Sequence, residues 1–183
     1  MRFKRRRGVV HAELDAVEAG VLFSVAGDLL ELLGAGEAPD QDPLAAMVGL
    51  PSGPVERPHD PALARLLPDA YGDDDAAATD FRRYTEADLR SGKRADAELL
   101  RSMVGPLQDR GGRLPLDRAQ AGAWLTCLND LRLVLGTRLG VTEQTEDAEL
   151  DEDSPRAQAL LLYSWLGWLQ ESLLGALDPE LHR

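Results

Sequence analysis

The sequence contains a single cysteine, Cys127, so no disulfide can form within the chain. A chain without disulfides is typical of a reducing compartment. No apolar run approaches the roughly 20 residues that a membrane-spanning helix needs. The residues that follow the basic N-terminus are too polar to be the core of a signal peptide. We therefore expect a soluble, cytoplasmic protein with no membrane partner.

The patterns that usually announce a metal, a cofactor or a catalytic centre are also missing. The three histidines, His11, His59 and His182, are scattered, and there is no CxxC or HExxH motif. Gly111 and Gly112 lack the lysine and the spacing of a phosphate-binding loop. The sequence therefore predicts no metal, no cofactor and no catalytic residues, and favours a protein that is not an enzyme.

Positive charge is scarce and unevenly placed. The formal net charge is -12, with 32 acidic against 20 basic residues. Five of the basic residues fall in the first seven positions: Arg2, Lys4, Arg5, Arg6 and Arg7. So acidic a chain argues against direct DNA contact, which needs a basic surface. The basic start is a candidate partner-binding segment. Alternatively, it protects a strand edge by its charge or folds onto the acidic body.

The length of 183 residues suits one domain, and we expect a single helical domain over 1–183. Within it, residues 1–14 are either a basic arm or a hairpin of two strands, 2–7 and 9–14. A proline-rich loop region covers 34–59, and an acidic run over 143–153 is typical of a flexible loop. A short strand at 113–116 can pair with the hairpin.

The clearest helix spans 117–140. Asp117 is placed as its N-cap, with Gln120 completing a capping box, and Gly140 is placed to end it in a left-handed turn. Further helices are expected at 15–33, 43–48, 60–67 and 154–177, and over 76–104 as one kinked helix or two. These patterns predict an all-α fold, a bundle of about five to seven helices, with or without a small N-terminal β-hairpin.

Polar side chains are densest on the central helix. Asn129, Asp130, Arg132 and Arg138 can form a patch for a partner or line a small-molecule pocket. They can equally form a structural network, because polar groups buried in a bundle must be paired. Cys127 lies on or beside the apolar face, where it is either a small buried hydrophobe or a redox-active thiol.

Several segments resemble a known family. They are the start RFKRRRG, DPALARLLPDAYGDDD over 60–75, FRRYTEADLR over 81–90, AWLTCLNDLRLVLGTRLGVTE over 123–143 and YSWLGWLQESLL over 163–174. Together they resemble the actinobacterial oxidative stress regulator (AosR-like) family, also known as a domain of unknown function. The resemblance implies a cytoplasmic transcription regulator that contacts a sigma factor. A disulfide switch within one chain needs two cysteines, so this chain either lacks such a switch or uses Cys127 between chains.

Two alternatives stay open beside a regulator that acts by protein contact. One is an enzyme or small-molecule-binding protein with a polar pocket near Asn129, Asp130 and Arg132. The other is a structural homodimer through the last helix, which would expose an apolar stripe along Trp165, Leu169 and Leu173.

Overall fold

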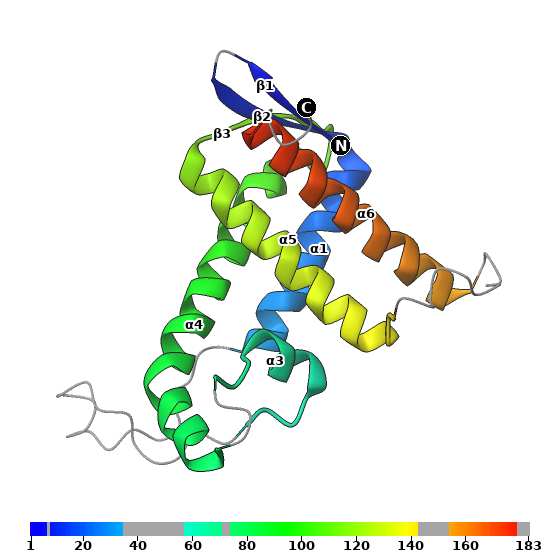
Figure 1. Ribbon diagram of the computed structural model, residues 1–183. Helices are drawn as coiled ribbons and strands as arrows, with labels where there is room; N and C mark the ends of the chain where they lie inside the picture. The colour runs from blue at the N-terminus through cyan, green and yellow to red at the C-terminus, as the bar shows by residue number, and fades with distance from the viewer. Residues whose placement is uncertain (7, 35–56, 71–73, 143–153, 179–183) are drawn as a thin grey trace.

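A computed structural model describes residues 1–6, 8–34, 57–70, 74–142 and 154–178. The predicted helix at 43–48 and the acidic loop at 143–153 lie outside the described residues. The elements in chain order are β1 (Arg2–Arg6), β2 (Val9–Leu14), α1 (Ala16–Leu33), α3 (Pro61–Leu66), α4 (Asp75–Val104), the 3-10 helix η1 (Gly105–Leu107), β3 (Gly112–Leu116), α5 (Arg118–Leu139) and α6 (Pro155–Leu177) (Figure 1).

The three strands form one antiparallel sheet in the order β1-β2-β3. β1 and β2 make the N-terminal hairpin, and β3 adds to β2 with Val10 opposite Leu116. Both the hairpin and the third strand are therefore confirmed. The fold is mostly helical, as predicted, but it is not purely all-α. The signal for strands is weak because β1 consists almost entirely of charged residues and β3 contains a glycine and a proline.

The helix ends follow the capping residues that the sequence contains. Asp15 and Glu18 form a capping box at the start of α1, and Asp117 and Gln120 form another at the start of α5. α5 ends at Gly140, whose φ of 62° and ψ of 41° are left-handed. The structure confirms these predicted boundaries. The sequence could predict them because each depends on contacts between residues that are close in the chain.

α4 is one helix of 30 residues that begins after the N-cap Asp74. Gly92 lies near its middle and does not end it. Thr85 does not start a second helix, because its hydroxyl donates to the Phe81 carbonyl one turn earlier at 2.8 Å. The alternative of one long helix is thus the correct one.

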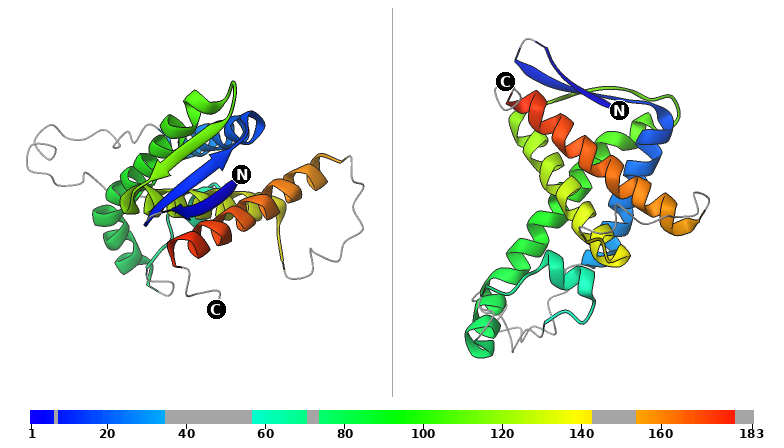
Figure 2. Two further views of the ribbon diagram at one scale, coloured as in Figure 1. Left: turned by 90° about the horizontal axis from the view of Figure 1, so that it is seen from above. Right: turned by 45° about the vertical axis from the view of Figure 1, so that its right-hand side comes forward.

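α5 is the central helix of the bundle and packs against α3, α4 and α6 (Figures 1 and 2). The sheet lies at one end of the bundle, and α3 lies toward the other. Trp124 of α5 is fully buried and meets the ring of Phe3 edge-on, with 6.1 Å between the ring centres. This contact attaches the sheet to the helical core.

α6 is apolar around most of its circumference but buries only part of it. Leu169 and Leu173 are fully buried, so the stripe predicted along Trp165, Leu169 and Leu173 is wrong. The exposed large apolar side chains of α6 are instead Leu161, Trp168 and Leu174, at 68%, 48% and 41% exposure. No helix in the described ranges is both long enough and apolar enough to cross a membrane.

Candidate functional site

Asp130 of α5 is the most deeply buried charged residue in the described part of the chain, at 1% exposure. Its Oδ1 accepts a hydrogen bond from Lys93 Nζ of α4 at 2.7 Å, and the two form an ion pair. Burial raises the pKa of Asp130, and the bond from Lys93 opposes that rise. The pair joins α4 to α5 within the core.

Cys127 lies one turn before Asp130 and is fully buried. Burial, together with the negative charges of Asp130 and Asp96, raises the pKa of the thiol to about 12. A redox-sensor thiol needs exposure and a neighbouring positive charge that lowers its pKa. Cys127 is buried, and the positive charge of Lys93 lowers the pKa of its thiol by less than burial and the two carboxylates raise it, so this geometry favours the interpretation of Cys127 as a small buried hydrophobe.

Arg132 extends from α5 toward α6 rather than toward Asp130. Its Nη1 donates to Gln170 Oε1 at 2.9 Å, and its guanidinium lies 5.1 Å from the centre of the Tyr163 ring. The guanidinium crosses α6 at Gly167, where an added Cβ would lie 3.3 Å from Arg132 Nε. Across the same interface, an added Cβ on Gly136 would lie 3.2 Å from the Tyr163 ring. Two glycines thus make room for the two large side chains between α5 and α6.

Arg138 extends in a third direction, toward α3. Its Nη2 lies 2.5 Å from Asp60 Oδ2, while Asp60 Oδ1 caps the start of α3 by accepting from the backbone of Ala62 and Leu63. The bond from Arg138 is the main cause that lowers the pKa of Asp60. Asn129 is exposed. The four residues predicted as a patch therefore do not converge, and three of them each tie α5 to a different helix.

Two arginines of α4 serve a structural role that sequence reasoning missed. Arg90 donates to the Leu33 carbonyl at 2.6 Å, and Arg94 donates to the carbonyls of Leu30, at 3.1 Å, and Gly34. These are carbonyls at the C-terminal end of α1, which have no partner within the helix and carry its negative dipole end. No pattern within α1 predicts this, because the donors lie about 60 residues further along the chain.

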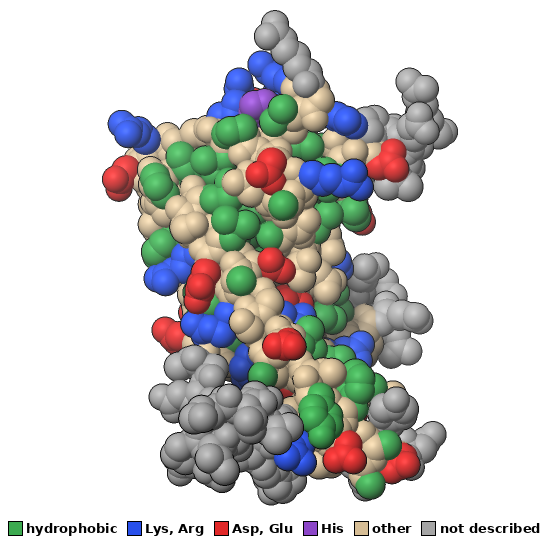
Figure 3. All heavy atoms as spheres, turned by 90° about the vertical axis from the view of Figure 1, so that its left-hand side faces the viewer, with side chains coloured by type: hydrophobic (Ala, Val, Ile, Leu, Met, Phe, Trp, Pro, Cys, Tyr) green, Lys and Arg blue, Asp and Glu red, His purple; other side chains and the backbone are tan. Residues whose placement is uncertain are grey.

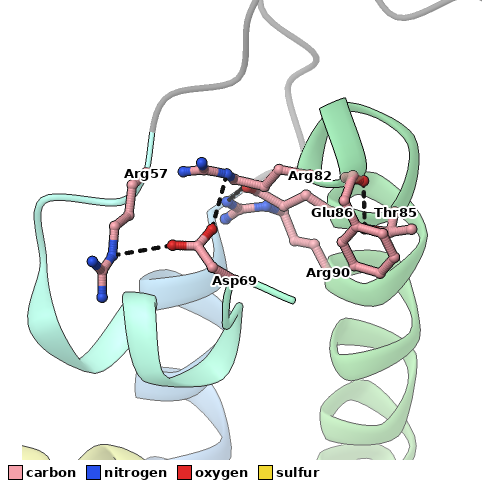
Figure 4. Close-up of polar contacts among 7 residues, drawn as sticks. Arg57, Asp69, Arg82, Thr85, Glu86 and Arg90 are labelled. Carbon is pink, nitrogen blue, oxygen red and sulfur yellow. Dashed lines mark hydrogen bonds and ion pairs between the residues drawn. The ribbon is translucent and has the colours of Figure 1, made fainter. Parts of the chain in front are cut away.

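A second charged cluster lies where the segments flanking α3 meet α4. Figure 4 shows Asp69 between Arg57 and Arg82, with nitrogen–oxygen distances of 3.5 and 3.3 Å. Arg82 is buried at 8% exposure. Next to it, Arg90 pairs with Glu86 of the same helix at 2.6 Å. These residues all lie within or beside the segments that carry the family resemblance, but the sequence analysis did not single them out.

The N-terminal basic residues divide between two faces of the sheet. The side chains of alternate residues point away from the core and form what we call the basic sheet face: Arg2, Lys4, Arg6, His11, Glu13 and Arg113. Figure 3 shows several Lys and Arg side chains at the end of the molecule that carries the sheet. Arg5 differs, because its Nη1 donates to the Leu177 carbonyl at the end of α6, at 3.3 Å. Arg7 lies outside the described residues.

Within the described ranges, no three His, Cys, Asp or Glu side chains are grouped so that they could hold a metal ion. A shallow, open depression lies beside α3, lined by Arg57, Pro58, His59, Pro61 and Ala64. None of the four predicted polar residues of α5 lines it.

The fold and its polar contacts define a helical protein with a small antiparallel sheet, in which most internal charges hold helices together. A family model described as "Domain of unknown function (DUF2017)" matches residues 1–177, and the chain belongs to this family. A protein of Mycobacterium tuberculosis named "Oxidative stress regulator AosR" is 37% identical, over 86% of this chain and 77% of the relative. A Mycobacterium bovis protein of the same name matches equally, and a Mycobacterium leprae relative is 35% identical over 87% of this chain and 78% of its own length. No solved structure matches the chain.

Proposed function

We propose that this protein is a non-enzymatic, cytoplasmic regulator of the oxidative stress response that acts by binding a sigma factor or another transcription protein. The observation that carries the proposal is the 37% identity, over most of both chains, to proteins named oxidative stress regulators. The sigma factor is the partner that the family resemblance implies.

The geometry of α5 supports a role in protein contact rather than in catalysis. Each of three polar residues of α5 bonds to a different helix or its cap: Asp130 to α4, Arg132 to α6 and Arg138 to the cap of α3. A catalytic site needs titratable groups that converge on one place a substrate can reach. These three residues point in different directions and serve the packing of the bundle, which leaves the surface as the place for recognition.

The test is a pull-down from the extract of cells grown with and without peroxide, using the tagged protein as bait. We expect a sigma factor or RNA polymerase to be recovered, and then to bind the purified protein directly. A tagged acidic protein of similar size is the control for nonspecific charge effects. Recovery of no transcription protein above this control would contradict the proposal.

A Cys127→Ser variant in the same pull-down separates regulation in general from a thiol switch. Because the thiol is buried and its pKa is raised to about 12, we expect peroxide to act equally on the wild type and the variant. A peroxide effect that disappears in the variant would instead identify Cys127 as the sensor. Either result leaves the contact with a transcription protein to be judged on its own.

A homodimer is a second candidate, favoured by one observation on α6. Leu161 and Trp168 are seven residues apart, share one side of the helix and are both exposed. Exposed apolar side chains in a row mark many protein interfaces. Light scattering of the wild type and a Trp168→Gln variant tests this candidate: a dimer that the substitution converts to a monomer supports it, and a monomeric wild type excludes it.

A further inference from the structure

The basic sheet face has an unusual charge for this molecule. It carries four cations, Arg2, Lys4, Arg6 and Arg113, against the single carboxylate of Glu13, which gives a formal net charge of +3 with His11 neutral. The whole chain has a net charge of -12, so the remaining residues together carry -15. The face is therefore a small positive area on a strongly negative protein.

The charges on this face are arranged in rows set by the strand register. Arg2 lies opposite Glu13, which lies opposite Arg113, and Lys4 lies opposite His11 in the next row. Glu13 is already shared, with its Oε2 3.1 Å from Lys4 Nζ and its Oε1 2.6 Å from Arg113 Nη2. These two cations hold the pKa of Glu13 below its ordinary value.

Arg2 and Arg6 are the cations that remain available on this face. Both are exposed, and neither has an ion pair among the described residues. Side chains two positions apart on a strand are about 7 Å apart, so Arg2, Lys4 and Arg6 form a regular row along β1. Carboxylates on alternate residues of another extended segment have the same spacing, and the arginine guanidinium binds carboxylates in two-bond pairs.

We propose that the basic sheet face is a docking surface for an acidic, extended segment of a partner protein, in which carboxylates recur at every second residue. This inference rests on the proposed function, since it specifies the chemistry of the partner. Arg2 and Arg6 bind the carboxylates at the two ends of the row, and Lys4, which is paired with Glu13, lies between them. Arg5 takes no part, because it is bound to the end of α6.

The size of the face favours a peptide segment over nucleic acid. β1 has five residues, which corresponds to about 17 Å. A DNA duplex carries a charge about every 1.7 Å and extends beyond this length in both directions. The charges beyond the face would meet the acidic body, and repulsion acts over a Debye length of about 8 Å at physiological salt. A short acidic segment lies entirely within the positive area.

The test is a fluorescence anisotropy titration with a labelled peptide of about ten residues in which glutamate alternates with threonine. A peptide of the same composition, with its glutamates in one block, tests the spacing. The proteins are the wild type, Arg2→Gln, Arg6→Gln, the double variant and Arg65→Gln. Arg65 is an exposed arginine of α3, toward the other end of the bundle, and serves as the matched control for loss of one positive charge.

We expect the alternating peptide to bind the wild type more tightly than the block peptide does. Each of Arg2→Gln and Arg6→Gln should weaken binding about 2- to 5-fold, with the double variant near the product of the two. The double variant should also show a flatter dependence of affinity on salt, because fewer charges are neutralised on binding. Arg65→Gln should match the wild type.

Three results would overturn the inference: no binding of either peptide to the wild type, an equal loss in Arg65→Gln, or tighter binding of a short DNA duplex that is lost in the arginine variants. The last would assign the face to nucleic acid. Failure of the docking inference can be distinguished from failure of the proposed function. If the double variant still recovers the same transcription protein, the regulator stands and this surface is excluded. If the peptide result holds but no transcription protein is recovered, the surface stands and the regulator does not.

Discussion

The central helix α5 and the basic sheet face both carry polar residues that are close in sequence, yet the fold uses them in opposite ways. On α5, Asp130 and Arg132 are two residues apart, which turns them to different sides of the helix and toward α4 and α6. On β1, Arg2 and Arg6 are four apart, and the two-residue period of a strand puts them on one face. A helix at the centre of a bundle disperses its polar residues, and a strand with one exposed face collects them.

The two regions differ in solvent as well as in direction. Between helices, a charge must be paired, because an unpaired buried charge costs several kcal/mol. On the exposed face of a sheet, water solvates the charge and no partner is required. The charges on α5 can therefore be explained by their contribution to the stability of the fold. The charges on the sheet face contribute little to that stability and need another explanation. The following predictions test this contrast, from the largest expected effect to the smallest.

The two lysines of the chain give the sharpest comparison, because each pairs with a carboxylate. Lys93→Met leaves the carboxylate of Asp130 buried and unpaired, and should lower the free energy of unfolding by about 3 to 5 kcal/mol at pH 7. Lys4→Met removes the exposed partner of Glu13 and should leave the unfolding midpoint almost unchanged. Guanidinium denaturation measures both.

A control shows whether the loss in Lys93→Met comes from the unpaired charge. The double variant Lys93→Met/Asp130→Leu replaces both partners by apolar groups and should recover most of the lost stability. Equal losses in the single and double variants would show that packing, and not charge, dominates at this position.

Two glycines with left-handed backbones, one at each region, should differ in their tolerance of a side chain. Gly111, before β3, has a φ of 66°, and an added Cβ would lie 2.6 Å from the Leu14 carbonyl oxygen. Gly140, at the end of α5, has a φ of 62° and open space around it. Gly111→Ala should cost at least about 2 kcal/mol and Gly140→Ala about 1 kcal/mol, measured by thermal unfolding. Equal losses would mean that backbone strain alone sets the cost.

The carboxylate of Asp96, on α4 beside α5, should give stability a pH dependence opposite in sign to that of Glu13 on the sheet face, because the pKa of Asp96 is raised and that of Glu13 is lowered. Burial and then the charge of Asp130 raise the pKa of Asp96 in the folded state. Protonated Asp96 therefore contributes to the free energy of unfolding, and this contribution is complete below about pH 4, the ordinary pKa of an aspartate. It is lost as the pH rises through the raised pKa of Asp96 in the folded state. Asp96→Asn should change little at pH 4 and should become more stable than the wild type as the pH approaches 7. Unfolding midpoints at several pH values measure this, and a constant difference across the range would contradict it.

The smallest effect is expected where the sheet arginines are removed. Arg2→Gln/Arg6→Gln should change the free energy of unfolding by less than about 0.5 kcal/mol, because both side chains are exposed and outside any ion pair of the described residues. Chemical denaturation of the double variant beside the wild type measures the difference. A loss above about 1 kcal/mol would show that these arginines stabilise the fold, and would remove the reason to assign them to a partner.

The sequence by itself determined the ends of the helices and the family. Asp15, Asp117 and Gly140 act on residues within a turn of themselves, so their effects can be read without the fold. The short strand expected at 113–116, and its pairing with the hairpin, are also confirmed by β3.

Only the tertiary structure decided what the polar residues do. Lys93 meets Asp130, and Arg94 meets the end of α1, across 37 and 60 or more residues of chain. The directions in which Arg132 and Arg138 extend depend on which helices flank α5. Arg5 is separated from the other arginines of β1 because the end of α6 lies beside it. The physical reason is that capping and periodicity are local, whereas the pairing of a charge depends on whichever element the fold places beside it.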